Sequence, residues 1–173
     1  MKKLTKISIS IIFIFLIGVF YLSLSKSSHY DTKNIIGKKI SKIELTSFTG
    51  NKVYNNEILK KNKFTLINFW ASWCSPCRNE HPYLMALSKN KNLNILGINF
   101  KDKDKTASIF LEELGNPYDF LVKDASGKQS VTFGIYGIPE SILINKETFI
   151  IKKFVGPLND NNSKEIEKIL KEQ

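Results

Sequence analysis

The sequence predicts one α/β domain, in which helices flank a mixed central β-sheet, behind a single apolar N-terminal segment. Three observations predict it. Short apolar runs typical of buried strands alternate with helical patterns, as in an α/β fold. Only a turn separates the last two predicted strands, so the sheet should end in an antiparallel hairpin and be mixed. The length of 173 residues allows one well-buried domain.

The N-terminal segment is an uncharged apolar run over residues 7–24, preceded by three lysines in residues 1–6. At about 1.5 Å per residue, a helix of this length nearly crosses the hydrocarbon core of a bilayer. Because basic residues stay on the cytoplasmic side, we expect residues 1–6 in the cytoplasm and 7–24 as a transmembrane anchor. A cleaved signal peptide is the alternative, although Ser23-Leu24-Ser25 is a poor small-x-small cleavage site.

Residues 25–33 are polar and without periodicity, which is typical of a tether, and the folded domain is expected over residues 34–173. Apolar alternation and β-branched residues predict the strands, and Gly, Asn and Asp clusters predict the turns between them. We expect strands at 40–48, 64–70, 94–100, 118–122, 141–145 and 149–155. We expect helices at 55–61, from the cysteine pair to residue 88, at 106–114, ending near 133, and at 159–171.

The charge balance is strongly basic, with 26 Lys and Arg against 16 Asp and Glu and a formal net charge of +10. Such a balance can indicate a nucleic-acid or anionic-membrane partner. However, Arg78 is the only arginine, the lysines are scattered, and no basic stripe with interleaved aromatic residues is present. We therefore do not expect nucleic-acid binding.

The only two cysteines, Cys74 and Cys77, lie where the buried strand at 64–70 passes into a helix. A cysteine at a helix N-terminus is stabilised as a thiolate by free backbone N–H groups and the helix dipole, which suits Cys74 as the nucleophile. Cys77, one turn further on, suits the resolving role. Pro76 restricts the loop between them and removes one N–H donor. The pair predicts a redox-active disulfide, Cys74–Cys77.

A Cys-x-x-Cys pair can also occur by chance, as half of a metal site or as a structural disulfide. Haem attachment would need histidine at position 78, where the chain has Arg78. A zinc site would need two more ligands, and the only histidines are His29 in the tether and His81 on the predicted helix. We interpret His81 as a packed or hydrogen-bonding helix residue, and we expect neither a metal nor a cofactor.

The segment from Asn68 to Pro82, Asn-Phe-Trp-Ala-Ser-Trp-Cys-Ser-Pro-Cys-Arg-Asn-Glu-His-Pro, resembles the active-site strand and helix of the thioredoxin superfamily. Gly134-Ile-Tyr-Gly-Ile-Pro-Glu140 resembles the segment that carries a cis-proline facing the dithiol, which would be Pro139. A helix-plus-strand insertion within residues 99–131 is similar to the membrane-anchored branch. With Val155-Gly156-Pro157, these motifs look most like the CcmG/DsbE family of cytochrome c biogenesis, over about residues 35 to 170.

The resemblance implies a thioredoxin-like fold with an N-terminal strand extension, and a reductase whose domain lies in the periplasm at the bacterial inner membrane. A membrane thiol-electron transporter of the CcdA/DsbD kind would supply electrons to the Cys74–Cys77 pair. The pair would then reduce the disulfide of an apocytochrome c or of its haem-ligation partner before haem attachment. The resemblance favours this reductant branch over a strong oxidant that installs disulfides.

Asn68 stands where thioredoxin itself carries a buried aspartate, so a proton acceptor beneath the resolving cysteine is missing there. Glu80 follows Cys77 by three residues, and Glu140 adjoins the predicted cis-proline. A nearby carboxylate opposes thiolate formation, and a desolvated one can hold a proton at neutral pH and pass it on. We hypothesise that Glu80 and Glu140 transfer protons or tune the thiol pKa values; the alternative for Glu80 is a solvated helix residue.

The aromatic residues beside the dithiol are expected to have different roles. Trp70 is interpreted as core, whereas Trp73 is interpreted as an exposed part of a docking platform. The platform would also include Pro76, Pro139 and the backbone of Ile138, which could pair with an extended substrate strand.

The sequence leaves two other functions open. One is a general extracytoplasmic disulfide reductase of the TlpA/ResA kind, which shares the chemistry. The other is a non-enzymatic thioredoxin-fold protein that handles haem or copper; copper modules of that kind usually space their cysteines one residue wider and add a distant histidine. The sequence does not identify the substrate, the electron donor, the reduction potential or the oligomeric state.

Overall fold

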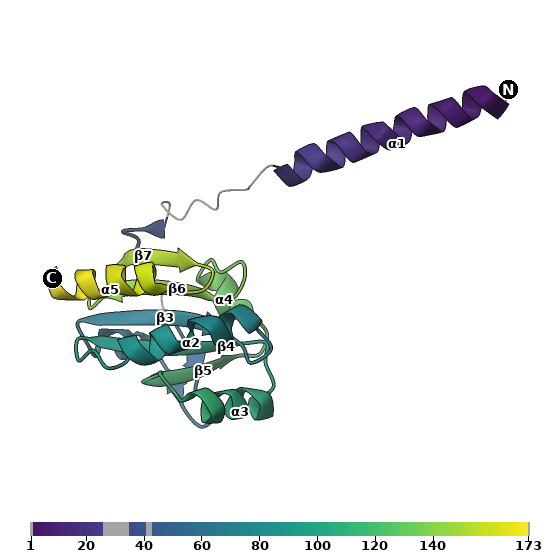
Figure 1. Cartoon of the computed structure of the whole chain (residues 1–173). Helices are drawn as coiled ribbons and strands as arrows, with labels where there is room; N and C mark the ends of the chain where they lie inside the picture. Colours follow the sequence, from purple (N-terminus) through teal and green to yellow (C-terminus); the bar gives the residue numbers. More distant parts are fainter. Residues whose placement is uncertain (1, 26–34, 41–42, 173) are drawn as a thin grey trace. The chain divides into compact units, whose positions relative to one another are not determined.

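The structure, a computed structural model, describes residues 2–25, 35–40 and 43–172 (Figure 1). It divides into two compact units, Met1–Thr32 and Lys33–Gln173. The predicted tether at 25–33 lies almost wholly outside the described residues. The boundaries predicted for the anchor and the tether therefore stay predictions.

The first unit consists of helix α1 (Lys2–Ser25). Within it, Thr5–Ser23 is 19 residues long with a mean hydropathy of 2.2, so it is long and apolar enough to cross a membrane. Its large apolar side chains are exposed on all sides of the helix. A helix that is apolar on all sides is stable in an apolar environment, which is either a protein core or a lipid bilayer.

A five-stranded sheet in the order β5-β4-β3-β6-β7 forms the centre of the second unit. Its strands are β3 (Phe64–Trp70), β4 (Leu93–Phe100), β5 (Phe120–Asp124), β6 (Glu140–Asn145) and β7 (Ile150–Val155). β3 pairs with β4, and β4 with β5, in parallel, whereas β6 is antiparallel to both β3 and β7. The predicted mixed sheet with a terminal hairpin is confirmed. Every residue of β3 is buried, as expected for a strand covered on both faces.

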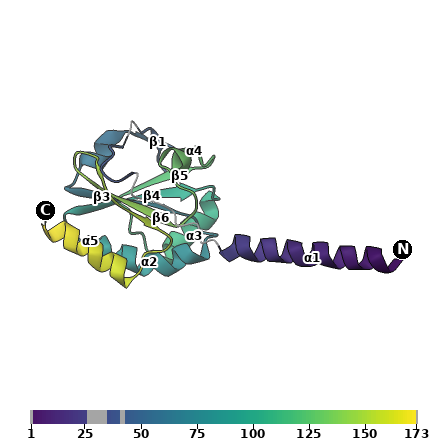
Figure 2. The same ribbon diagram turned by 90° about the horizontal axis from the view of Figure 1, so that it is seen from above.

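Helices cover both faces of this sheet (Figure 2). They are η2 (Asn56–Lys60), α2 (Ser75–Leu87), α3 (Asp104–Leu114), α4 (Lys128–Thr132) and α5 (Asp160–Glu172). On one face α2, α3 and α5 pack against the sheet through residues that include Leu84, Phe110 and Ile166. On the other face lie η2 and the N-terminal extension, whose Leu45 and Leu59 are fully buried. The dithiol is on the first of these faces, because Cys74 and Cys77 belong to its core.

The strand predicted at residues 40–48 is wrong in its extent. Of the described residues in the range 40–48, only Leu45–Thr46 form a strand, β1. It pairs with β2 (Val53–Tyr54), which the sequence did not predict. The segment crosses a face of the sheet: Ile40 N–H donates to Thr148 beside β7, whereas Ser47 bridges to β5. The alternation of apolar residues therefore reflects burial against this face, not pairing along one strand.

The strand predicted at 64–70 has the predicted bounds, and the other predicted elements are present with shifted ends. The predicted helix at 55–61 is the 3-10 helix η2, whose first turn is capped by the Asn55 side chain, which accepts from Glu57 N–H. The strand predicted from residue 118 begins at Phe120. Tyr118 instead turns its ring into the core, where it stacks on Trp70 with 5.5 Å between ring centroids.

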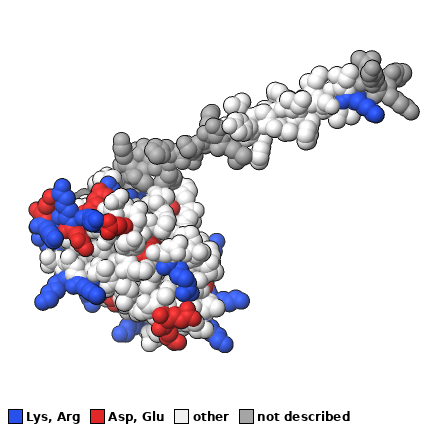
Figure 3. Space-filling model, viewed as in Figure 1, with Lys and Arg blue, Asp and Glu red and all other residues white. Residues whose placement is uncertain are grey.

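Charged side chains are spread over the surface. On the face shown in Figure 3, lysines and arginine are interspersed with acidic residues and no continuous basic stripe is visible. Several of them form surface ion pairs, for example Lys152 with Glu165 and Lys164 with Asp160. Exposed pairs of this kind contribute about 0–1 kcal/mol each, so they do not determine the fold.

The packing of Tyr118 depends on a glycine in the central sheet. A Cβ added to Gly97 on β4 would lie 2.6 Å from carbon atoms of the Tyr118 ring. We expect Gly97→Ala to lower the free energy of unfolding by about 1–3 kcal/mol, because a well-packed ring must move. Chemical denaturation of the full chain in detergent, followed by circular dichroism, measures this change.

Gly137→Ala is the matched control, because a Cβ there would meet no atom within 4 Å. Equal stabilities of the two variants would show that the Tyr118 ring moves aside without cost, contrary to the expectation.

Candidate active site

Sheet register brings three chain segments together at one end of β3. Trp70, the last residue of β3, pairs with Asn99 of the parallel strand β4. Phe69 pairs with Glu140, the first residue of the antiparallel strand β6. The chain that leaves β3 toward the cysteines therefore lies beside the chain that leaves β4 and the chain that enters β6. The site residues predicted from the sequence lie in the connection after β3, in the loop before β6, at the first residue of β6 and in helix α2.

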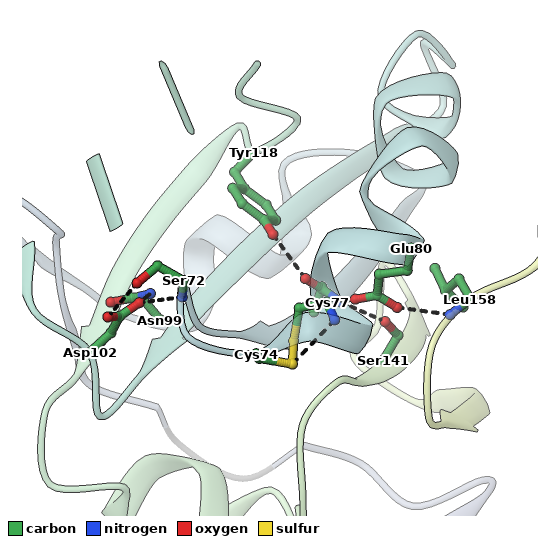
Figure 4. The surroundings of a disulfide bond; sticks show 10 residues. Ser72, Cys74, Cys77, Glu80, Asn99, Asp102, Tyr118, Ser141 and Leu158 are labelled. Atoms are coloured by element: carbon green, nitrogen blue, oxygen red, sulfur yellow. Dashed lines mark hydrogen bonds between the residues drawn. A yellow bond between two sulfur atoms is a disulfide. The ribbon is translucent and has the colours of Figure 1, made fainter. Parts of the chain in front are cut away.

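The two cysteines form a disulfide at the start of α2, with an S–S distance of 2.07 Å (Figure 4). Cys74 is the N-cap of the helix, and its Sγ accepts a hydrogen bond of 3.2 Å from Cys77 N–H. An acceptor at this position is favoured by the free N–H groups and by the helix dipole, more strongly when it is a thiolate. The predicted disulfide is thus present, and Cys74, the predicted nucleophile, lies at the N-terminus of the helix.

The loop before β6 carries the predicted cis-proline, since the Ile138–Pro139 bond is cis. Glu140 fixes this loop: its Oε1 accepts from Tyr136 N–H and Gly137 N–H, each at 3.2 Å. Its Oε2 forms a buried ion pair of 2.6 Å with Lys153 on β7. Glu140 therefore contacts its own loop and a lysine, which indicates a role in positioning Pro139. Proton transfer by Glu140 stays a prediction.

Lys153 completes the anchoring of the loop. Its side chain is 0% exposed, and Nζ donates a 2.7 Å hydrogen bond to the carbonyl oxygen of Gly134. Burying an ammonium and a carboxylate is costly unless both are paired and hydrogen-bonded, as they are here. Sequence analysis did not find Lys153, because nothing in the alternation of β7 marks it as inward-facing.

Asp102 holds the turn that precedes the cysteines. Its carboxylate accepts from Ser72 N–H and Oγ and from Asn99 Nδ2. Partial burial raises the pKa of Asp102, but hydrogen bonds from Ser72, Asn99 and Lys103 outweigh it and keep the pKa below its ordinary value. This ionised carboxylate ties the connection after β4 to the connection after β3. The sequence contains no signal for it beyond the residue type.

Trp73 and Trp70 occupy the environments that were predicted. Trp73 is 59% exposed, and its indole Nε1 donates to Lys101 O at 3.1 Å, so the ring lies against the connection after β4. Trp70 is buried in the core. His81 is buried as well, with Nε2 at 3.0 Å from the carbonyl oxygen of Gly115, which confirms its interpretation as a hydrogen-bonding helix residue. Pro76 lies exposed in the first turn of α2.

Glu80 is fully buried, so its interpretation as a solvated helix residue is wrong. Its Oε1 accepts from Asn68 Nδ2 at 2.7 Å, and Oε2 accepts from Leu158 N–H at 2.8 Å. Asn68 also donates to Ser141 Oγ and accepts from the Tyr118 hydroxyl, both at 3.0 Å. Figure 4 shows the labelled members of this network together with the disulfide, and Cys77 and Glu80 are both buried. Sequence analysis missed Tyr118 and Ser141 because their sequence separation from Asn68 is large.

Burial raises the pKa of Glu80 to about 7, although the hydrogen bonds from Leu158 and Asn68 lower it. A carboxyl group with this pKa exchanges a proton near neutral pH, which is the range where a general acid or base is most effective. Burial, and secondarily the Glu80 charge, raises the pKa of Tyr118 well above its ordinary value, so its hydroxyl stays a donor to Asn68. Asn68 is then oriented with its amide NH₂ toward Glu80.

The amino-acid sequence that forms this site matches a known protein family. The Redoxin family model matches residues 35–170, which is most of the chain. The chain belongs to the Redoxin family. Membership agrees with the site, because the matched region contains the dithiol, the cis-proline and the buried Glu80 network.

Curated relatives place the chain more narrowly within this family. It is 50% identical over 105 residues to the thiol:disulfide interchange protein CycY of Rhizobium leguminosarum bv. viciae, covering 61% of this chain and 56% of that protein. It is 35% identical over 126 residues to the thiol:disulfide interchange protein DsbE of Haemophilus influenzae, covering 73% of this chain and 69% of that protein. The chain is therefore a member of the DsbE group of thiol:disulfide interchange proteins within the Redoxin family.

Solved structures confirm the thioredoxin-like fold. The thioredoxin domain of a thiol-disulfide oxidoreductase from Bacteroides vulgatus superposes with a TM-score of 0.65 at 26% identity. The superposition covers 78% of this chain and 97% of that domain. The fold class predicted from the active-site motif is thus correct for this Redoxin-family member.

The raised pKa of Glu80 predicts a pH-dependent stability. The folded protein binds the Glu80 proton up to about pH 7, whereas the unfolded chain releases it near the ordinary value of 4.5. Stability should therefore fall as pH rises from 4.5 to 7, by about 3 kcal/mol from this group. In Glu80→Gln this part of the pH dependence should vanish. Denaturation of the oxidised full chain at several pH values measures it.

Glu57→Gln is the control, because Glu57 is exposed on η2 and pairs with Lys60 in its own turn. This variant should keep the fall in stability between pH 4.5 and 7 that Glu80 causes. If Glu80→Gln kept the same fall, a raised pKa for Glu80 would be excluded.

The ion pair between Lys153 and Glu140 predicts a large stability effect. Lys153→Met should lower the free energy of unfolding by about 3–5 kcal/mol, because the Glu140 carboxylate would remain buried without its partner. Adding Glu140→Gln to this variant should recover part of the loss, since the unpaired charge is then removed. Chemical denaturation at neutral pH measures all three proteins.

Lys152→Met is a matched control on the neighbouring position of β7. Lys152 is 38% exposed on its side chain and pairs with the equally accessible Glu165, so its loss should cost about 0–1 kcal/mol. A loss in Lys153→Met no greater than in Lys152→Met would contradict the anchoring role.

Proposed function

We propose that the protein is a membrane-anchored protein-disulfide reductase that acts outside the cytoplasm. The observation that carries this proposal is the Cys74–Cys77 disulfide at the N-terminus of α2. Membership of the DsbE group, whose curated proteins are named thiol:disulfide interchange proteins, supports the same chemistry.

In the reduced protein the Cys74 thiolate attacks one sulfur of a substrate disulfide. That S–S bond breaks, a mixed disulfide forms, and the released substrate thiolate takes a proton. Cys77 then attacks Cys74 Sγ, which releases the second substrate thiol and closes the Cys74–Cys77 disulfide. Two electrons pass from the protein to the substrate, and the protein must be reduced again by a dithiol before the next cycle.

Glu80 supplies the proton acceptor for the second step. Cys77 must lose its proton to attack, and Glu80 follows it by one helical turn in the buried network (Figure 4). A pKa of about 7 allows Glu80 to take this proton near neutral pH. Asn68, which replaces the buried aspartate of thioredoxin, holds Glu80 through the hydrogen bond of 2.7 Å. The buried carboxyl group of the site therefore comes from helix α2 in this chain, instead of from strand β3.

The substrate is the disulfide of an apocytochrome c, or of a haem-ligation protein, whose cysteines must be reduced before haem attachment. The resemblance of the active-site and cis-proline motifs to the DsbE group supports this assignment. The electron donor is a membrane thiol-electron transporter of the CcdA/DsbD kind. The docking platform is the exposed Trp73 and Pro76 together with Ile138 and Pro139, where an extended substrate strand pairs with the Ile138 backbone.

Helix α1 anchors the protein in the bacterial inner membrane with the domain in the periplasm. The helix is long and apolar enough to span a bilayer, and the lysines before it favour a cytoplasmic N-terminus. A periplasmic location suits the chemistry, because disulfides form in oxidising compartments, so cysteines that must be reduced there need a dedicated reductase.

A trapping experiment tests this function. In Cys77→Ala the mixed disulfide cannot resolve, so Cys74 should remain covalently linked to its substrates when the full chain is expressed in its own cell. We expect to recover proteins that carry Cys-x-x-Cys-His, or haem-ligation components, by non-reducing electrophoresis and mass spectrometry.

Cys74→Ala is the matched control and should recover none of these partners, because the attacking sulfur is gone. Recovery of unrelated cysteine proteins by Cys77→Ala would show a general reductase of the TlpA/ResA kind. Recovery of no partner by either variant would contradict a protein-disulfide substrate.

A further inference from the structure

A groove of about 510 Å³ lies next to the cis-proline loop, and thiol-disulfide exchange at the cysteines does not itself use it. Its walls are the loop residues 135–138, the helix α4 with the turn before it, and the end of β4 at Phe100 and Lys101. Ile138, the residue expected to pair with substrate, is one of the residues that line it. A polypeptide that docks at Ile138 therefore has this groove directly beside it.

The groove exposes apolar side chains. Val131 on α4 is 72% exposed and Tyr136 in the loop is 79% exposed, while Ile135 and Ile138 contribute more buried surface. Single exposed apolar residues are common on proteins, but several gathered in one concave site beside a reactive disulfide indicate a binding surface. An occupant should therefore present at least one apolar side chain.

The charge of the groove is positive. Lys101 and Lys128 line it, and its lining includes no aspartate or glutamate from residues 2–25, 35–40 or 43–172. Neither lysine forms an ion pair with an acidic side chain among the residues that the structure describes.

The acidic residues near the groove are hydrogen-bonded elsewhere. Asp124, four residues before Lys128, caps the start of α4 by accepting from Ser130 N–H and Oγ. Asp102, which follows Lys101, accepts from Ser72, and Glu140 pairs with Lys153.

Lys101 is exposed, but its side chain packs against the wall of the groove. Its Nζ lies 5.2 Å from the centroid of the Phe100 ring, a cation–π contact. Its side chain crosses Gly127 so closely that a Cβ there would lie 2.5 Å from Lys101 Cε and 3.2 Å from Nζ. The glycine thus leaves room for the ammonium group at the wall of the groove.

We propose that this groove binds the substrate segment that flanks the reacting cysteine and selects an acidic side chain there, next to an apolar one. The inference rests on the proposed function and adds a sequence preference to it. Residues 135–138 span about 10 Å in extended conformation, so the acidic side chain should lie within about three residues of the cysteine. The lysines supply the complementary charge, and Val131 and Tyr136 supply the apolar contact.

The test uses the reduced full chain in uncharged detergent micelles and synthetic peptides with one internal Cys-x-x-Cys disulfide. Two peptides differ only in carrying Asp or Lys within three residues on both sides of the cysteines. We expect the Asp peptide to be reduced about tenfold faster at low salt, and the difference to shrink as salt screens the charges. Peptide rates are divided by the rate with hydroxyethyl disulfide, an uncharged small substrate.

Charge reversal makes the test specific to the groove. Lys128→Glu should remove the preference for the Asp peptide and improve reduction of the Lys peptide. Lys105→Glu is the matched control: Lys105 is exposed on α3 and does not line this groove, so its variant should keep the full preference.

Equal rates for the two peptides, or an unchanged preference in Lys128→Glu, would overturn the inference while leaving the reductase function intact. Reduction of hydroxyethyl disulfide without reduction of either peptide would overturn the proposed function, and the inference with it.

Discussion

Strand β3 pairs with β4 on one side and with β6 on the other, in opposite directions. This register brings the end of β3, the end of β4 and the start of β6 to one edge of the sheet. The dithiol follows the end of β3, Asp102 follows the end of β4, and the cis-proline loop precedes β6, so none of them has to be placed by a long flexible segment. The site is therefore as rigid as the sheet, which suits a reaction that needs two sulfurs and a docking loop in fixed relation.

The protein places two acidic residues in its interior near the site, and their surroundings differ. Glu140 is neutralised by Lys153 and used to hold the cis-proline loop. The hydrogen-bond donors to Glu80 within the described residues, Asn68 and Leu158, are neutral. Burial therefore raises its pKa to about 7 and makes it a proton-exchanging group. A buried carboxylate without a cation is destabilising in its charged form. Such a cost is typical of functional sites, where a perturbed pKa is part of the chemistry.

Two concavities lie near the disulfide, and they differ in charge. The lining of one includes Arg78, Asp102 and Glu113, so it carries charges of both signs. The other is the groove beside Ile138, whose charged residues, within the part of the chain that the structure describes, are lysines. Lys101 lines both concavities. In the proposed docking mode, a substrate strand that pairs with the loop before β6 would meet the lysine-lined groove.

The sequence by itself determined the alternation of strands and helices, the position of the cysteines at a strand-to-helix junction and the cis-proline segment, because these are local patterns of at most about fifteen residues. It did not predict that residues 40–48 cross the sheet instead of forming one strand, since apolar alternation records burial and not the pairing partner. It left the Glu80 environment undecided, and it missed Tyr118, Asp102 and Lys153. These side chains act through partners many residues away, such as Asn68 for Tyr118 and Glu140 for Lys153. Only the tertiary structure decided which polar groups are buried together, because desolvation and hydrogen bonding depend on what packs around a residue and not on its neighbours in sequence.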